Sequence, residues 1–252
     1  MFRTLLAKEL LEQRRTSKLL IFLAVFFIVG CISPLLAKYT PELLRTIPDI
    51  PPEFAKLIPT PTLKDSVDQY AKNTSQFGVL LIILLTMNVI AQERERGTAA
   101  MLFSKPVRRS AVVLSKWLAG MLTVTVSVIL SSIACAIYTF ILFGSLPVGK
   151  YLIFNLLLLL FLAVYLSTAL LASALARTQG MAAATAFGGL TILLVLSSLP
   201  RINNFCPVGL LNWGSAILNG TGKAQWPALL ISLAIVAACI LLSCLYLEKQ
   251  EI

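Results

Sequence analysis

The sequence predicts an all-α polytopic membrane protein with six transmembrane helices, and two observations support this. The chain of 252 residues is 58% hydrophobic and only 13% charged, whereas a soluble domain carries about a quarter charged residues. Six long apolar runs hold the surplus, and a bilayer crossing needs roughly 20 such residues. The runs cover residues 19–37, 76–91, 112–143, 151–176, 181–199 and 227–247. We therefore expect a single transmembrane domain over residues 1–252.

Residues 1–18 are the first element, and we interpret them as an interfacial helix that leads into span one. Between Phe2 and Arg15, apolar side chains such as Leu6 and Leu10 fall near one helical face, and charged side chains fall on the other. A helix of this kind lies in the plane of the membrane surface. A solvated N-terminal tail is the alternative.

The first apolar run passes through Cys31 in a string that resembles a lipoprotein cleavage box. The run continues past Cys31 to Ala37, and five more runs follow. We therefore favour an uncleaved first span over a lipid-anchored N-terminus.

The first outer loop is expected over residues 38–75. Six of the twelve prolines lie between Pro41 and Pro61, and proline removes a backbone donor, so this stretch is predicted to be extended and non-helical. Residues 63–74 place apolar side chains on one helical face. They are predicted to form a short interfacial helix that enters span two.

The second outer loop is expected over residues 200–226. It mixes Gly, Asn and Pro with apolar residues, and it is apolar enough around 208–211 and 216–218 to re-enter the membrane. Such a segment is tolerated only where protein or water covers its backbone.

Lysine and arginine gather in four flanks of the spans. These are the N-terminal segment, the segment between spans two and three, Arg177 and Lys249. Six spans place all four flanks on one side, which the positive-inside rule assigns to the cytoplasm. Both termini are therefore predicted to be cytoplasmic, in a bacterial or archaeal cell membrane.

The residue types exclude several kinds of chemistry. The chain has no histidine, and its five cysteines form no C-x-x-C pair, so the usual zinc frameworks and His-dependent nucleophiles are absent. We expect no catalytic and no metal-binding residues. The net charge of +10 lies in short segments between apolar runs, where it suits a lipid bilayer rather than nucleic acid.

Ionisable residues are almost absent from the apolar runs. Only Lys116, near the cytoplasmic end of the third run, interrupts them. Ion-coupled transporters commonly hold such groups in mid-membrane, so these spans lack an evident internal source of energy, although sites built from carbonyls and hydroxyls remain open. A pathway without buried charge favours a hydrophobic or amphipathic cargo.

Residues 92–111 form the most elaborate polar segment. Acidic and basic side chains alternate from Glu93 to Arg96, Gly97 interrupts the helix, and a short apolar helix is predicted before Pro106. Basic residues then lead into span three. By charge alone, the segment could be a positive-inside flank that only fixes topology.

This segment resembles the signature of ABC transporter permeases of the type-2 exporter superfamily. In that family, span two commonly ends in Glu-x-Glu-x-Gly-Thr, followed by a short apolar helix, a Ser/Thr-x-Pro-Val step, basic residues and a Gly/Ser-Lys pair that opens span three. The matching residues are Glu93, Glu95, Gly97, Thr98, Ser104, Pro106, Val107, Arg109, Ser115 and Lys116.

Three further segments support the resemblance. The string Lys8-Glu9-Leu10 resembles the family's interfacial helix, and residues 177–180 resemble its loop between spans four and five. Residues 246–252 resemble its C-terminal ending, although Gln250 stands where the family often has arginine.

The resemblance implies the permease half of an exporter. Two such chains, as a homodimer or a related heterodimer, would dock on a separate ABC-type ATPase that carries ATP and Mg. The short helix between spans two and three would be the coupling helix. The ATPase-coupling residues implied are Glu93, Arg94, Glu95, Arg96, Gly97, Thr98, Met101, Leu102 and Pro106.

No cofactor is expected on this chain, because the string from Gly220 to Ala224 lacks the residues that a phosphate loop requires. By analogy with the family, spans two and five would line the dimer interface. Candidates for the substrate pathway are Met87, Asn88, Phe187 and Leu190, for which ordinary helix packing is the alternative.

Two rival functions remain at this point. A non-transporting scaffold or sensor subunit could use the same fold, with the outer proline-rich loop as its binding element. An intramembrane enzyme acting on lipid is a third interpretation, but the lack of intramembrane charge and histidine disfavours it.

Overall fold

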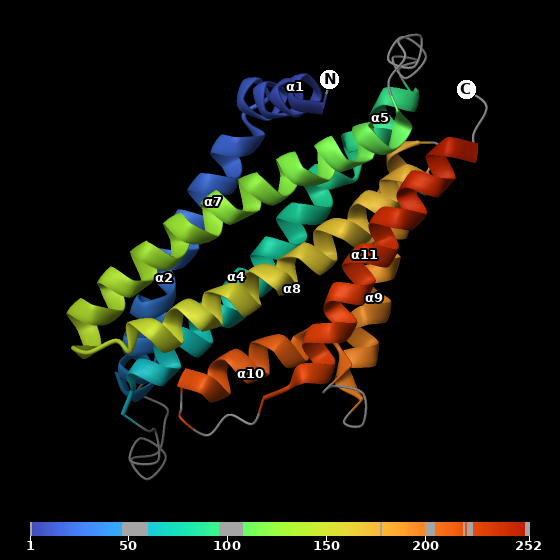
Figure 1. Ribbon diagram of the computed structural model, residues 1–252. Coiled ribbons are helices and arrows are strands. Elements are labelled where there is room, and N and C mark those ends of the chain that lie inside the picture. The colour runs from blue at the N-terminus through green and yellow to red at the C-terminus, as the bar shows by residue number, and fades with distance from the viewer. Residues whose placement is uncertain are drawn as a thin grey trace.

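The described part of the chain is folded almost entirely into α-helices (Figure 1). A computed structural model describes residues 2–46, 60–95, 108–176, 178–199, 205–218, 220 and 224–249. The helices are α1 (Phe2–Arg15), α2 (Lys18–Thr46), α4 (Leu63–Thr86), α5 (Asn88–Glu95), α7 (Arg109–Phe143), α8 (Val148–Leu175), α9 (Gln179–Ser198), α10 (Val208–Leu218) and α11 (Trp226–Lys249).

Six helical stretches are long and apolar enough to cross a membrane, which confirms the predicted all-α fold with six spans. Each predicted apolar run falls on one of them, and α1 lies where the N-terminal helix was predicted. The stretches are Lys18–Glu42, Leu63–Ala91, Arg109–Phe143, Val148–Leu175, Gln179–Ser197 and Trp226–Glu248.

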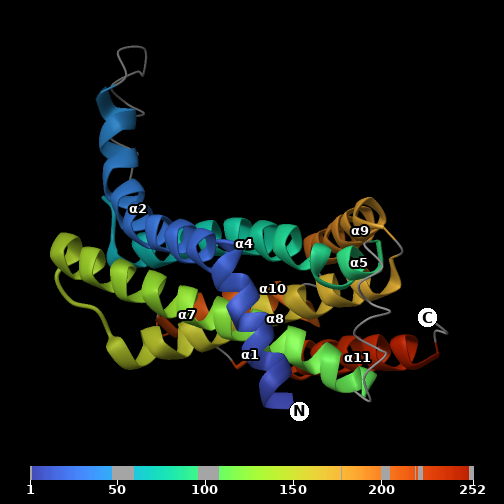
Figure 2. The ribbon, with the colours of Figure 1, turned by 90° about the horizontal axis from the view of Figure 1, so that it is seen from above.

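α8 runs through the centre of the bundle. Of its most apolar stretch 72% is buried, against 11% for α9, and α8 packs against α4, α7, α9, α10 and α11. Seen from above, α2, α4 and α9 lie on one side of it and α11 on the other, while α7 crosses it (Figure 2). Outward-facing Leu20, Ile141 and Leu156 are 66–69% exposed, as expected for side chains that lipid covers.

The two ends of the bundle differ in what they carry. α1, the end of α5, the start of α7 and the end of α11 lie together at one end, which we call the α1 end (Figure 1). The starts of α4 and α8 lie at the opposite end, beside α10, which we call the α10 end. The predicted flanks that the structure describes are therefore gathered on one side.

A glycine allows α2 and α7 to pack closely. A Cβ at Gly30 would collide with the backbone carbonyl of Ser131, so the two backbones approach more closely than any other residue would permit. Small residues play this part at helix crossings in membranes, where packing rather than water exclusion holds helices together.

The prediction of an extended loop between Pro41 and Pro61 is wrong at its start. α2 continues to Thr46 and contains Pro34 and Pro41. Proline inside a helix removes one donor, and the rest of a long helix in lipid keeps its backbone satisfied. Residues 47–59 lie outside the described part of the chain.

The short interfacial helix predicted over residues 63–74 is the first half of a continuous helix, α4. Its start is fixed by a capping interaction, because the backbone N–H and the hydroxyl of Thr62 both donate to Oδ2 of Asp65, at 2.8 and 2.7 Å. A carboxylate there also suits the positive end of the helix dipole. Span two is therefore longer than predicted, and its first turns carry charge.

Part of the second predicted loop forms α10. Leu210 is fully buried there, and a Cβ at Gly214 would come within 2.8 Å of the Phe154 ring of α8. With 11 residues, α10 is too short to cross a bilayer. Its re-entry into the membrane stays a prediction.

Candidate functional site

The predicted coupling segment falls partly outside the described residues. This applies to Arg96, Gly97, Thr98, Met101, Leu102 and Pro106. Glu93 and Arg94 lie in the last turns of α5, but their side chains are also outside the description. The structure therefore places the two ends of this segment, at Glu95 and Arg108, and leaves the coupling helix untested.

Glu95 at the end of α5 contacts the start of α9. Its carboxylate accepts a hydrogen bond from the backbone N–H of Gln179 at 3.2 Å. The first N–H groups of a helix have no partner within the helix and carry a partial positive charge, so a carboxylate stabilises them. Thr178 caps the same end by accepting from the N–H of Met181.

Span two is interrupted at Met87, between α4 and α5. A hydroxyl on α8 forms hydrogen bonds with the backbone at this interruption. Oγ of Ser173 donates to the carbonyl of Met87 at 2.8 Å. The same oxygen accepts from the N–H groups of Ile90 and Ala91, at 3.1 and 3.2 Å. The last turns of span two are thus hydrogen-bonded to the central helix.

The start of α7 is tied to the end of α11. Nη1 of Arg109 donates to the carbonyl of Leu247 at 2.7 Å and to that of Glu248 at 3.3 Å. The last carbonyls of a helix lack partners and favour a cation. Arg109 lies near the end of the predicted coupling segment, so this contact joins that segment to the C-terminal span.

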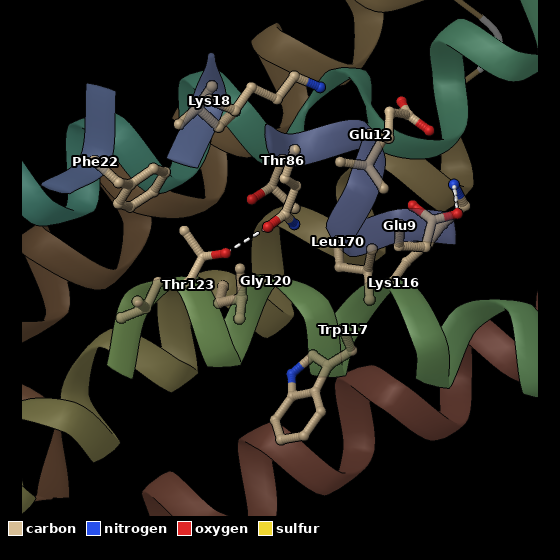
Figure 3. Close-up of a pocket in the computed structure, with 15 residues that line it drawn as sticks. Glu9, Glu12, Lys18, Phe22, Thr86, Lys116, Trp117, Gly120, Thr123 and Leu170 are labelled. Carbon is tan, nitrogen blue, oxygen red and sulfur yellow. Dashed lines mark hydrogen bonds and ion pairs between the residues drawn. The ribbon is translucent and has the colours of Figure 1, made fainter. Parts of the chain in front are cut away.

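The lysine that interrupts the third apolar run forms a buried ion pair with α1. Nζ of Lys116 lies 3.1 Å from Oε1 of Glu9, and the two side chains are 2% and 9% exposed. Nζ of Lys8, at 3.4 Å, contacts the same oxygen from a side chain that is 46% exposed. Figure 3 shows Lys116 reaching from α7 toward Glu9.

A second polar contact joins the same two helices. The hydroxyl of Thr123 donates to Oε1 of Gln13, two turns further along α7 (Figure 3). Between the two contacts lies a small pocket of about 50 Å³, with Lys18, Thr86 and Gly120 among its lining residues. α1 is therefore held against span three by side-chain contacts, and it is also covalently linked to span one.

A second cavity lies nearer the α10 end, between α4, α8, α9 and α10, and has a volume of about 830 Å³. Apolar side chains of all four helices form most of its wall, and three charged residues of α4 stand along it. The described residues that line it are Lys64, Asp68, Ala71, Lys72, Ser75, Gln76, Val79, Leu80, Phe161, Tyr165, Phe187, Leu190, Leu194, Val208, Leu211, Asn212, Ser215 and Ala216.

Two of the four pathway candidates, Phe187 and Leu190, line this cavity. Met87 does not, and packs instead against Ala91 and Ala182 near the α1 end. Asn88 opens α5, and its side chain is outside the description. The structure thus brings together the candidates from span five and separates them from Met87.

The described part of the chain provides a cavity and interhelical polar contacts rather than a metal centre. Within the described ranges, no group of three or more His, Cys, Asp or Glu side chains could hold a metal ion. What it offers is a cavity at one end and, at the other, polar contacts between helices far apart in the sequence.

Sequence reasoning missed the partner of Lys116 and the charged turns of α4. A signal for the first was present, because a lysine within an apolar run needs a partner, and Glu9 lies in the predicted N-terminal helix. The charges of these turns were missed because the prediction for residues 63–74 rested on their apolar face alone.

Comparison with known proteins adds family information. The family model described as ABC-2 family transporter protein matches residues 3–202. The chain is also 30% identical over 114 residues to an uncharacterized transmembrane protein of Bacillus subtilis, YxlG. That alignment covers 45% of this chain and 44% of the relative, so it spans less than half of either protein.

Proposed function

Because the chain belongs to the ABC-2 family of transporter proteins, and is thus a membrane-spanning transport component, we propose that it is the permease subunit of an ATP-driven exporter. A separate ABC-type ATPase, with its ATP and Mg, supplies the energy. Two permease chains, identical or related, form the membrane part. The α1 end faces the cytoplasm, with both termini on that side.

The observation that supports this best is the set of contacts at the α1 end. The two ends of the predicted coupling segment are each bonded to another span: Glu95 to the start of α9, and Arg109 to the end of α11. Lys116, two turns into α7, is paired with α1. A push on residues 96–107 would therefore reach spans five and six and the N-terminal helix directly, as a rigid-body transition requires.

The cavity between α4, α8, α9 and α10 is the proposed substrate pathway. Its wall is mainly apolar, which suits a hydrophobic or amphipathic cargo. Phe187 and Leu190 would contact this cargo. The second chain would pack on α9, where a Cβ at Gly188 or Gly189 meets no atom within 4 Å. Small residues with open space beside them suit a close helix–helix contact.

The test is co-purification with the candidate ATPase from the neighbouring reading frame. The wild-type chain should retain the ATPase, and Glu93→Ala/Glu95→Ala should lose it, because charge-assisted contacts hold the docked segment. Lys150→Ala, an exposed residue at the α10 end, is the control and should bind as wild type does. Unchanged association and transport in a well-folded double variant would remove this segment from the coupling role.

Assays of the same complex distinguish a permease from a scaffold or sensor subunit. A permease should couple the ATPase to cargo, so amphipathic compounds should change the rate of ATP hydrolysis in reconstituted vesicles and accumulate across the membrane. ATP hydrolysis that no compound affects, together with no net movement of cargo, would favour the scaffold.

A further inference from the structure

The charged residues along the large cavity form a single stripe. Lys64, Asp68 and Lys72 follow one another at intervals of four residues on α4, and all three line the cavity. Residues four apart lie on one face of a helix. None of the three forms an ion pair of 4.0 Å or less with a described residue.

The cavity changes character along α4. Lys64, Asp68 and Lys72 line it in the first turns of α4, and Val79 and Leu80 line it about two turns further on, with Ser75 and Gln76 between them. At 1.5 Å per residue, Lys72 and Leu80 are about 12 Å apart along the helix. One leaflet of a bilayer holds about 15 Å of hydrocarbon, so the distance from Lys72 to Leu80 is within the depth of a single leaflet.

A hollow with a charged rim and an apolar wall is complementary to a molecule with a charged head and an apolar tail. The stripe carries two positive charges and one negative charge, so its net charge is positive. A positive site favours an anionic head group such as a phosphate.

We propose that this cavity binds a membrane amphiphile with an anionic head group, of the phospholipid class. Lys64 and Lys72 hold the head, and the wall formed by Leu80, Leu190 and Leu194 holds the tail. The inference rests on the proposed function, because it names the class of cargo for the pathway cavity. The head then lies near the α10 end, on the side to which an exporter delivers.

The experiment measures lipid binding to the purified, delipidated full-length chain by native mass spectrometry. Phosphatidylglycerol is the anionic probe and phosphatidylcholine the zwitterionic one. Two ionic contacts favour the anionic lipid, and we expect it to bind about tenfold more tightly. Equal affinity for the two lipids would overturn the proposal.

The variants assign the effect to the stripe. Lys64→Gln/Lys72→Gln should weaken phosphatidylglycerol binding about tenfold, whereas Lys38→Gln/Lys150→Gln removes the same charge outside the cavity lining and should change it less than twofold. Asp68→Asn raises the net charge of the stripe and should tighten binding, a gain that misfolding cannot produce. Equal losses in the two lysine pairs would place the anionic contact elsewhere and refute the site.

A competition arm separates a lipid from a free anion. Inorganic phosphate in the millimolar range should not displace phosphatidylglycerol, because the tail contributes to binding. If phosphate displaces phosphatidylglycerol, the site binds anions in general, and the proposal that it binds an amphiphile is wrong. The lipid-binding measurement needs no ATPase. Absence of lipid binding would therefore not contradict the permease assignment, and absence of ATPase association would not contradict this lipid site.

Discussion

Replacing Lys116 by methionine tests whether the buried ion pair holds α1 on span three. The change removes the ammonium group and keeps an apolar side chain of similar length. At an effective dielectric constant of about 20, unit charges 3.1 Å apart attract each other by about 5 kcal/mol. Desolvation of both groups opposes that gain, and removing one partner of a buried pair costs about 3–5 kcal/mol.

The lower end of that range applies here. Glu9 keeps its contact with Lys8, and an ion pair with a half-exposed partner contributes at most about 1 kcal/mol. We therefore expect Lys116→Met to cost about 3 kcal/mol. For a chain of this size, 1 kcal/mol shifts the unfolding temperature by about 2–4 °C, so a decrease of about 6–12 °C is expected.

Thermal unfolding of the purified chain in detergent measures the decrease. Replacing both partners, as Glu9→Leu/Lys116→Met, should recover most of the lost stability, because a buried pair exchanged for apolar groups is often neutral or better. Glu12→Gln is the matched control. Glu12 lies on the same helix but is exposed, and its replacement should change stability by less than about 0.5 kcal/mol.

Two results would refute the reasoning about the pair. If Lys116→Met unfolds at the wild-type temperature, the ion pair does not stabilise the contact between α1 and α7. If the double variant is as unstable as the sum of the two single variants, the two charges act independently, and the coupling that the geometry predicts is absent.

Two further predictions concern packing. Ser173→Ala removes the hydroxyl that is hydrogen-bonded to the backbone around Met87, and it should lower the free energy of unfolding by about 2 kcal/mol because buried backbone groups lose their partner. The control Ser243→Ala loses only a hydrogen bond within its own helix and should cost less. Equal decreases in the unfolding temperature would contradict this expectation. Gly30→Leu should destabilise the chain by about 1–3 kcal/mol through overpacking. Gly189→Leu should leave the stability of the single chain unchanged and weaken only the dimer. Gel filtration with light scattering measures the dimer.

The spans could be predicted from the sequence because length and hydrophobicity are local properties. A run such as residues 151–176 must span a bilayer whatever its neighbours do. Its position in the bundle could not be predicted in this way. The run of α8 and that of α9 are both apolar, yet α8 is central and α9 is mostly exposed, and nothing in the residues of one helix says which partners will cover it.

Errors occurred where a local rule competed with a longer-range constraint. The prolines from Pro41 onward predicted an extended loop, but helix α2 continues through Pro41 to Thr46. A proline removes a single donor, which a long helix tolerates. The charges of α4 lie in the helix predicted over residues 63–74, but the cavity beside them is formed by helices far apart in the sequence, so the stripe along the cavity could not be inferred.

The structure gives one carboxylate of the coupling motif, Glu95, a contact that its charge alone did not predict. Alternating charges were expected to hold an ATPase, but Glu95 is within hydrogen-bonding distance of the α9 backbone. One carboxylate of the motif therefore holds the end of span two against the start of span five. A positive-inside flank needs only basic residues and would not require a carboxylate in this contact.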